Sequence, residues 1–163
     1  MLEAMMRGWI FLMMIGGVGS VFADNSPVAN PRYVIHGDSV YDKKTDLTWA
    51  RCSVGQRWEE GGGCVGSVNV YTFDHAQKQA NGPWRVPTKE ELMTLIDHNH
   101  ADNPQRPMID EVAFPNMDEK RLKYWTSTSL GSSAGWLLRF IDGHADGYLR
   151  GTAVAVRLVR SVQ

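Results

Sequence analysis

Cysteine is scarce in this chain of 163 residues, which has two, Cys52 and Cys64, and none beyond Cys64. A four-ligand zinc site would need two more soft ligands nearby, and the surrounding sequence does not supply them. A single disulfide is therefore favoured over a metal site. The loop between the two cysteines contains Gly55 and the glycine run 61–63, which allow the sulfur atoms to meet. A disulfide that closes so short a loop contributes about 3 kcal/mol in the chain-entropy model.

Long hydrophobic runs are also scarce. One unbroken apolar stretch, 9–15, follows Arg7, and Val21-Phe22-Ala23 suits cleavage by signal peptidase. We expect residues 1–23 to be a secretory signal peptide, because the stretch is short and glycine-rich for a membrane span; an uncleaved N-terminal anchor is the alternative. The expected product is periplasmic or secreted, with no membrane contact after cleavage. Export also favours the disulfide.

Repeats and low-complexity linkers are missing from the rest of the sequence. Residues 24–31 form a short polar lead-in with two prolines. The remaining length corresponds to one domain, so we predict a single domain over 32–163.

Neither sign of charge dominates, since the formal net charge is −1. The charges are nevertheless segregated: residues 24–119 include nine basic and fifteen acidic side chains, whereas 120–163 include seven basic and two acidic ones. An exported protein of this balance is not expected to bind nucleic acid. Two interpretations of the basic C-terminal part stay open. It forms a surface for an acidic polymer, because arginine donates paired N–H groups to sulfate and carboxylate, or Arg157 and Arg160 neutralise carboxylates of the first part.

Recognisable catalytic motifs are absent. The glycine run 61–63 is followed by no Lys-Ser/Thr pair and no helix start, so it is not a phosphate-binding loop. Ser127 does not lie in a nucleophile elbow, and both cysteines are expected to form the disulfide. We therefore predict no enzymatic activity and no cofactor.

Two polar stretches have partial metal-site character. Asp97, His98, His100 and Asp102 lie close together in sequence, but the two histidines are not at helical spacing, which favours a solvated loop. The stretch 142–147 has the spacing of the first half of a calcium loop, but alanine occupies the position where the ligating glutamate belongs. Two Asp-Gly turns, at 142–143 and 146–147, are the favoured interpretation, and we predict no metal site.

The clearest local signal is the run 84–92. Pro87 keeps the preceding residue extended, Thr88 is placed as an N-cap, and Glu91 three residues later completes a capping box. Apolar residues at helical spacing then predict a helix from Lys89 to His98. A second helix is predicted within 71–80. Strands are predicted at 33–36, 39–42, 47–50, 125–128 and 135–141, with 153–160 as a central strand. This order of elements is typical of an α+β fold.

Several short motifs follow one another in a fixed order over residues 40–160. Together they resemble the Lcl C-terminal domain family, which is named for the C-terminal domain of the Legionella collagen-like adhesin. The motifs are Asp46-Leu47-Thr48-Trp49, Arg51-Cys52-Ser53-Val54-Gly55-Gln56-Arg57-Trp58 with Cys64, Trp84-Arg85-Val86-Pro87-Thr88 with Glu91-Leu92, Ile109-Asp110 with Phe114-Pro115-Asn116, Tyr124-Trp125-Thr126-Ser127-Thr128, Phe140-Ile141-Asp142-Gly143 and Val156-Arg157-Leu158-Val159-Arg160.

The resemblance implies a C-type-lectin-like fold and a distant kinship with formylglycine-generating enzymes. The copper chemistry of those enzymes needs a cysteine pair in the C-terminal half, which this chain lacks. The Glu-Pro-Asn and Trp-Asn-Asp calcium signatures of true C-type lectins are also missing. The resemblance further implies binding of sulfated glycosaminoglycans and trimeric assembly. Because this chain has no collagen-like repeats, its oligomeric state stays open.

Tryptophan is common in the sequence and offers flat faces on which sugar rings stack. Trp84 and Trp125 are expected in the core because they stand at the entries of predicted elements, whereas Trp136 and Tyr148 are expected to be more exposed. We predict a non-catalytic binding module that recognises an acidic glycan or an envelope or host surface protein. The alternative is a periplasmic protein-interaction or inhibitor subunit of the immunity type. The predicted ligand-binding residues are Trp136, Arg139, His144, Tyr148 and Arg150.

Overall fold

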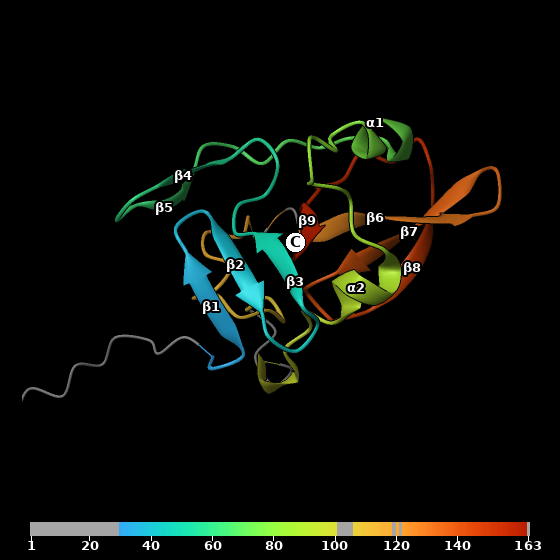
Figure 1. Ribbon diagram of the computed structural model, residues 1–163. Helices are drawn as coiled ribbons and strands as arrows, with labels where there is room; N and C mark the ends of the chain where they lie inside the picture. Colours follow the sequence, from blue (N-terminus) through green and yellow to red (C-terminus); the bar gives the residue numbers. More distant parts are fainter. Residues whose placement is uncertain (1–29, 101–105, 119, 121, 163) are drawn as a thin grey trace, which may run out of the picture.

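The computed structural model describes residues 30–100, 106–118, 120 and 122–162 (Figure 1). The predicted signal peptide and residues 24–29 of the lead-in lie outside this part. Within it the secondary structure consists mainly of antiparallel strands with two short α-helices, which confirms the α+β class. No helix in the described ranges has the length and apolar character needed to cross a membrane.

The first sheet contains four antiparallel strands in the order β1-β2-β3-β9. Its first three strands confirm the sequence predictions residue for residue. Gly37 and Asp46 have positive φ angles of 54° and 57° at the two turns, where glycine and aspartate tolerate this conformation best. The strands are β1 (Tyr33–His36), β2 (Ser39–Asp42), β3 (Leu47–Ala50) and β9 (Val159–Ser161).

The second sheet contains three strands in the order β6-β7-β8. They are β6 (Lys123–Leu130), β7 (Ala134–Arg139) and β8 (Ala145–Leu149). The predicted turn at Asp146-Gly147 is wrong, because both residues lie inside β8, with Gly147 opposite Trp136. A Cβ atom on Gly147 would lie 2.4 Å from Cδ2 of Leu130. The lack of a side chain at Gly147 therefore leaves room for the Leu130 side chain to pack over β8.

Helix α2 (Lys89–Met93) begins at the predicted capping box. The Thr88 side chain accepts the N–H of Glu91, and the Glu91 carboxylate accepts the N–H of Thr88. The helix ends five residues earlier than predicted. Beyond Met93 the chain forms i to i−3 hydrogen bonds, Thr94 Oγ1 donates to the Glu91 carbonyl, and Arg32 donates to the Thr94 carbonyl. These bonds satisfy the terminal carbonyl groups and stop the α-helix. The 3-10 turn η1 (His98–His100) follows.

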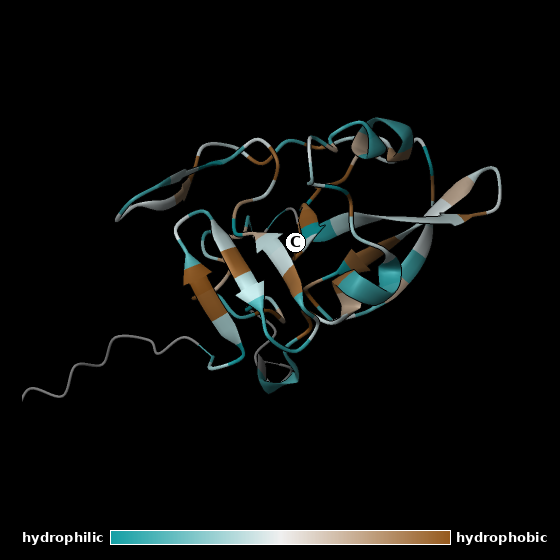
Figure 2. Cartoon of the chain, in the orientation of Figure 1, coloured by the Kyte–Doolittle hydropathy of each residue, from teal (hydrophilic) through white to brown (hydrophobic). Residues whose placement is uncertain are grey.

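Helix α1 (Phe73–Gln77) confirms the helix predicted within 71–80. Phe73 packs edge-on against Trp125 of β6, with the ring centroids 5.3 Å apart. The two helices thus rest on the second sheet, α1 against β6 and α2 against β6 and β7. Figure 2 shows the hydrophobic residues gathered in strands such as β1, β7 and β9, whereas α2 is largely hydrophilic.

The predicted central strand at 153–160 is mostly not a strand, since β9 covers its last two residues and Ser161. The segment nevertheless runs through the middle of the fold. Val154 exchanges two backbone hydrogen bonds with Tyr71, Ala155 bonds to Lys123 and Trp125, and Val159 exchanges two with Arg85. Because these partners belong to different parts of the chain, no continuous ladder forms.

The hairpin of β4 (Arg57–Glu59) and β5 (Gly63–Val65) projects beside the first sheet, near the turn from β1 to β2 (Figure 1). The predicted disulfide between Cys52 and Cys64 is confirmed, with their Cα atoms 5.3 Å apart. The backbone N–H of Cys64 also donates to Asn116 Oδ1 at 3.0 Å. The hairpin is thereby held at its base by a covalent bond and a hydrogen bond to a distant loop.

Candidate functional site

The five predicted ligand-binding residues all lie on or next to the second sheet, but they do not share one face. Side chains alternate along a strand, and this places Trp136 on one face of β7 and Arg139 on the other. Trp136 lies on the face that α2 covers, where Lys89 Nζ is 4.5 Å from the centroid of its ring. Trp136 and Tyr148 are each half-buried, as is Trp84, which we had expected in the core.

Arg139 is held by two carboxylates. Its Nη2 lies 2.7 Å from Asp142 Oδ2, and its Nε lies 3.2 Å from Asp146 Oδ2. The two aspartates of the calcium-like stretch therefore both face this guanidinium. Within the part of the chain that the structure describes, no three His, Cys, Asp or Glu side chains lie close enough to hold a metal ion. Asp102 of the other metal-like stretch lies outside the described residues.

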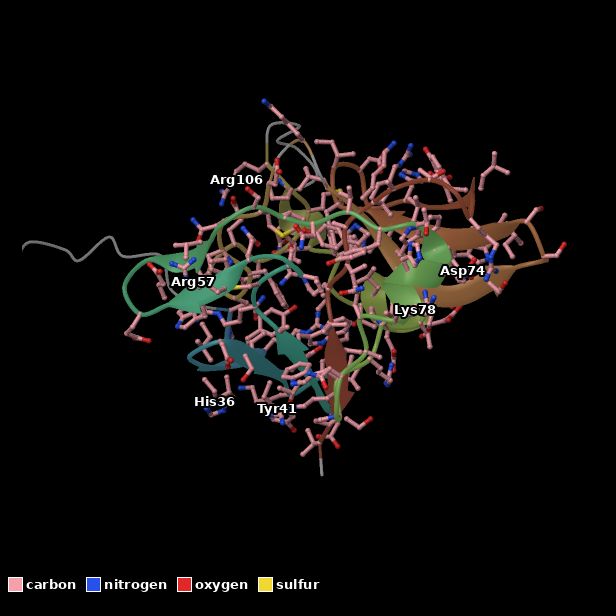
Figure 3. All side chains as sticks on the ribbon, turned by 90° about the horizontal axis from the view of Figure 1, so that it is seen from above. His36, Tyr41, Arg57, Asp74, Lys78 and Arg106 are labelled. Carbon is pink, nitrogen blue, oxygen red and sulfur yellow. A yellow bond between two sulfur atoms is a disulfide. The ribbon has the colours of Figure 1, made fainter. Side chains whose placement is uncertain are left out.

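Arg150 lies on a different part of the sheet, against α1. Its guanidinium pairs with Asp74, donates to Ser129 Oγ at 3.2 Å and lies 4.2 Å from the centroid of the Phe73 ring. Figure 3 shows Asp74 on the side of α1, far from Arg57 at the other end of the molecule. Arg150 and Arg139 thus each belong to a separate ion-pair group.

Lys123 and Tyr148 bring a base and an aromatic ring together near the surface. Lys123 Nζ lies 3.4 Å from the Tyr148 hydroxyl and 5.1 Å from the ring centroid. Lys123 is exposed and pairs in register with Arg139 across the sheet. His144 has an exposed side chain 3.6 Å from Asp142, and its carbonyl accepts the N–H of Arg139. Our sequence prediction did not include Lys123.

We call the group Lys120, Lys123, Arg139, His144 and Tyr148 the Lys123 surface. Lys120 is exposed three residues before Lys123. The group contains three permanent positive charges. Asp142 and Asp146 pair with Arg139, and the Asp118 carboxylate accepts the backbone N–H of Lys120, so positive and negative charges are about balanced here. An anion can pair with the lysines directly and can compete with the aspartates for Arg139.

Among the described residues, Arg157 and Arg160 of the C-terminal part do not extend this surface. Arg157 is buried and has no carboxylate partner among the described residues; it donates to the carbonyls of Ala50 and Arg51, and its pKa is lowered by burial. Arg157 therefore neither contributes to a surface for an acidic polymer nor neutralises a carboxylate of the described residues. Arg160 stacks over Trp84, with its guanidinium carbon 4.9 Å from the ring centroid.

A cleft of about 580 Å³ lies at the other end of the molecule, between the β1–β2 turn and the start of β4. It is lined by Gly37, Asp38, Ala50, Cys52, Ser53, Val54, Gly55, Gln56, Arg57, Trp58, Glu60 and Leu158. Its volume lies in the range of small-molecule sites. Sequence reasoning missed this cleft, although a tryptophan and charged residues inside a short disulfide loop were a usable signal.

Comparison with known proteins gives one family. Residues 38–160 match the family described as the Lcl C-terminal domain. No curated protein matches the chain.

Proposed function

This chain belongs to the Lcl C-terminal domain family, an adhesin-related family, and on that premise we propose that it is an exported, non-catalytic module that binds a sulfated, acidic glycan. The proposal includes a C-type-lectin-like arrangement of the α+β fold. The single observation that carries it is the contact between Lys123 and Tyr148 opposite Arg139.

The chemistry of this contact suits a sulfated sugar. Lys123 and Arg139 supply cationic donors for sulfate or carboxylate oxygens, and the Tyr148 ring offers a flat apolar face. The side chains of Lys120 and His144 are also exposed and add a permanent positive charge and an imidazole to this surface. Since the lysines are solvated, the attraction is screened by salt, and the affinity should fall as ionic strength rises.

The test is a comparison of matched polymers. The purified protein is presented with sulfated glycosaminoglycans and with chemically desulfated forms of the same chains, at low and at physiological salt. The proposal predicts binding to the sulfated forms alone, weakened by salt. Equal binding of both forms, or of neither, would contradict it.

The alternative is a protein-interaction subunit of the envelope, and the cleft beside the disulfide favours it. This cleft combines an aromatic face with carboxylates, an arrangement unsuited to a polyanion. Binding to neither glycan form, followed by retention of a specific envelope protein, would support this alternative.

A further inference from the structure

The indole of Trp58 is fixed in the cleft by a buried arginine. The guanidinium carbon of Arg51 lies 4.0 Å from the centroid of the Trp58 ring. Arg51 is 6% exposed and donates to the carbonyls of Gly37, Val112 and Ala113 at 2.7–2.9 Å. Burial lowers the pKa of Arg51, while the charge of Glu60 partly offsets this. Three carbonyl acceptors thus hold the guanidinium, and the guanidinium supports the ring.

The half-buried Trp58 lines the cleft, whereas Arg51, which covers one face of its ring, does not. The other face of the indole is therefore the one available to a ligand in the cleft. The Trp58 Nε1–H donates to Glu60 Oε2 at 3.3 Å, which fixes the rotation of the ring. Ala50, Val54, Leu158 and the disulfide-bonded Cys52 supply apolar lining beside it.

The charged side chains of the cleft favour a cation. Asp38 and Glu60 are exposed carboxylates that line it with Trp58. The Asp38 carboxylate has no ion-pair or hydrogen-bond partner in the described ranges. Arg57 also lines the cleft, but its guanidinium pairs with Glu59.

We propose that this cleft binds a cationic side chain of a protein partner, with arginine preferred. A planar guanidinium stacks on the open face of Trp58 and donates to Asp38 and Glu60 at the rim. A neutral sugar ring could use the indole but would gain nothing from the two charges, and a sulfated glycan would be repelled by them. This inference goes beyond the proposed glycan function and concerns a different surface.

The experiment uses two probes that differ by one charged group. Nα-acetyl-arginine methylamide is titrated into the protein while the indole N–H resonance of Trp58 is followed by NMR, and the corresponding citrulline derivative serves as the neutral control. We expect millimolar binding of the arginine derivative, weakened by salt, and at least about tenfold weaker binding of citrulline. Equal affinities, or perturbation of other indoles alone, would overturn the proposal.

Two variants test whether the arginine derivative binds in this cleft. Asp38→Asn with Glu60→Gln keeps the shapes but removes both charges, and we expect about a tenfold loss of arginine affinity with an unchanged unfolding curve. Glu90→Gln, an exposed carboxylate on α2, is the matched control and should bind as the wild type does. Undiminished binding by the double variant would overturn the proposal. A methyl glycoside that perturbs Trp58 when the arginine derivative does not would also overturn it.

Discussion

The guanidinium carbon of Arg157 lies 4.9 Å from the centroid of the Phe114 ring, in the interior of the protein. Arg157 is 1% exposed. Besides the carbonyls of Ala50 and Arg51, its partners are Ser53 Oγ at 3.4 Å and Met117 Sδ at 2.9 Å. Among the described residues its Nε has no hydrogen-bond partner. Arg157 thus has no counter-charge in the part of the chain that the structure describes. Carbonyl groups and aromatic faces hold this cation, and it joins the 154–159 segment to the end of β3.

Shortening Arg157 should strongly destabilise the protein. Arg157→Ala leaves a cavity and removes the donors from the buried Arg51 carbonyl and the half-buried Ala50 carbonyl, for an expected loss of about 4 kcal/mol in the free energy of unfolding. Arg157→Met keeps most of the volume and removes a costly buried charge, so its loss should be about 2 kcal/mol smaller. Urea unfolding measures both. Equal losses in the two variants would show that volume does not matter at this position.

Gly135 of β7 lies directly beneath Phe73. A Cβ atom there would be 2.3 Å from two carbon atoms of the Phe73 ring, which itself packs on Trp125. We expect Gly135→Ala to lower the free energy of unfolding by about 2–3 kcal/mol through overpacking. Gly151 has open space at its Cβ position, so Gly151→Ala is the matched control and should change stability by less than about 0.5 kcal/mol. Similar effects of the two substitutions would contradict the packing described.

The disulfide should make the hairpin of β4 and β5 sensitive to reductant. Cys52 and Cys64 are twelve residues apart, so opening the bridge should cost about 3 kcal/mol and lower the melting temperature. Thermal unfolding with and without dithiothreitol measures the shift. The Cys52→Ser, Cys64→Ser double variant is the control, because reductant should not change it further. An unchanged wild-type melting temperature under full reduction would refute the prediction.

The carboxylates of Asp42 and Glu91 should make the protein less stable in acid. Burial works to raise the pKa of Asp42, but hydrogen bonds from Arg32, Thr45 and the N–H of Lys44 outweigh it and hold this pKa below 3.8. The hydrogen bond from Arg85 lowers the pKa of Glu91 below 4.5 against the opposing effect of burial.

Both groups bind protons more weakly in the folded state than in the unfolded state. The stability they contribute is therefore fully present above their unfolded pKa values and is lost as pH falls through the folded ones. We expect the free energy of unfolding to decline below about pH 5. Asp42→Asn should cost about 3 kcal/mol at pH 7 by leaving Arg32 without its buried partner, and it should flatten the decline. Asp38→Asn, at an exposed position, is the control and should show the wild-type dependence of unfolding free energy on pH. The same dependence in Asp42→Asn would contradict the role given to the Asp42 carboxylate.

Local signals predicted the local structure well. The capping box of Thr88 and Glu91 depends on residues three apart, and the disulfide depends on a short flexible loop, so both could be inferred from neighbouring residues. Contacts between distant residues could not. The 153–160 segment has the composition of a strand, but its backbone groups bond to partners that are distant in sequence and separate from one another.

In the candidate sites, too, single residues could be predicted from the sequence, whereas contacts between distant residues could not. Charge counting identified Arg139 and Arg150 but could not reveal that Asp142 and Asp146 face one and Asp74 the other. Tyr148 was predicted, whereas its partner Lys123 became apparent through the register of β6 and β7. The cleft at Trp58 needs the β1–β2 turn and the 112–113 carbonyls, which are remote in sequence, to support Arg51.

Binding of a sulfated glycan to the Lys123 surface is tested by a charge-matched pair of variants. Lys120→Ala with Lys123→Ala removes two charges from this surface, whereas Lys43→Ala with Lys44→Ala removes two exposed charges from the β2–β3 turn. The dissociation constant for one sulfated glycosaminoglycan is measured for each at low and physiological salt. We expect at least about tenfold weaker binding and a smaller salt dependence for the first variant, with near wild-type binding for the second. Equal affinities of the two variants would contradict binding at this surface.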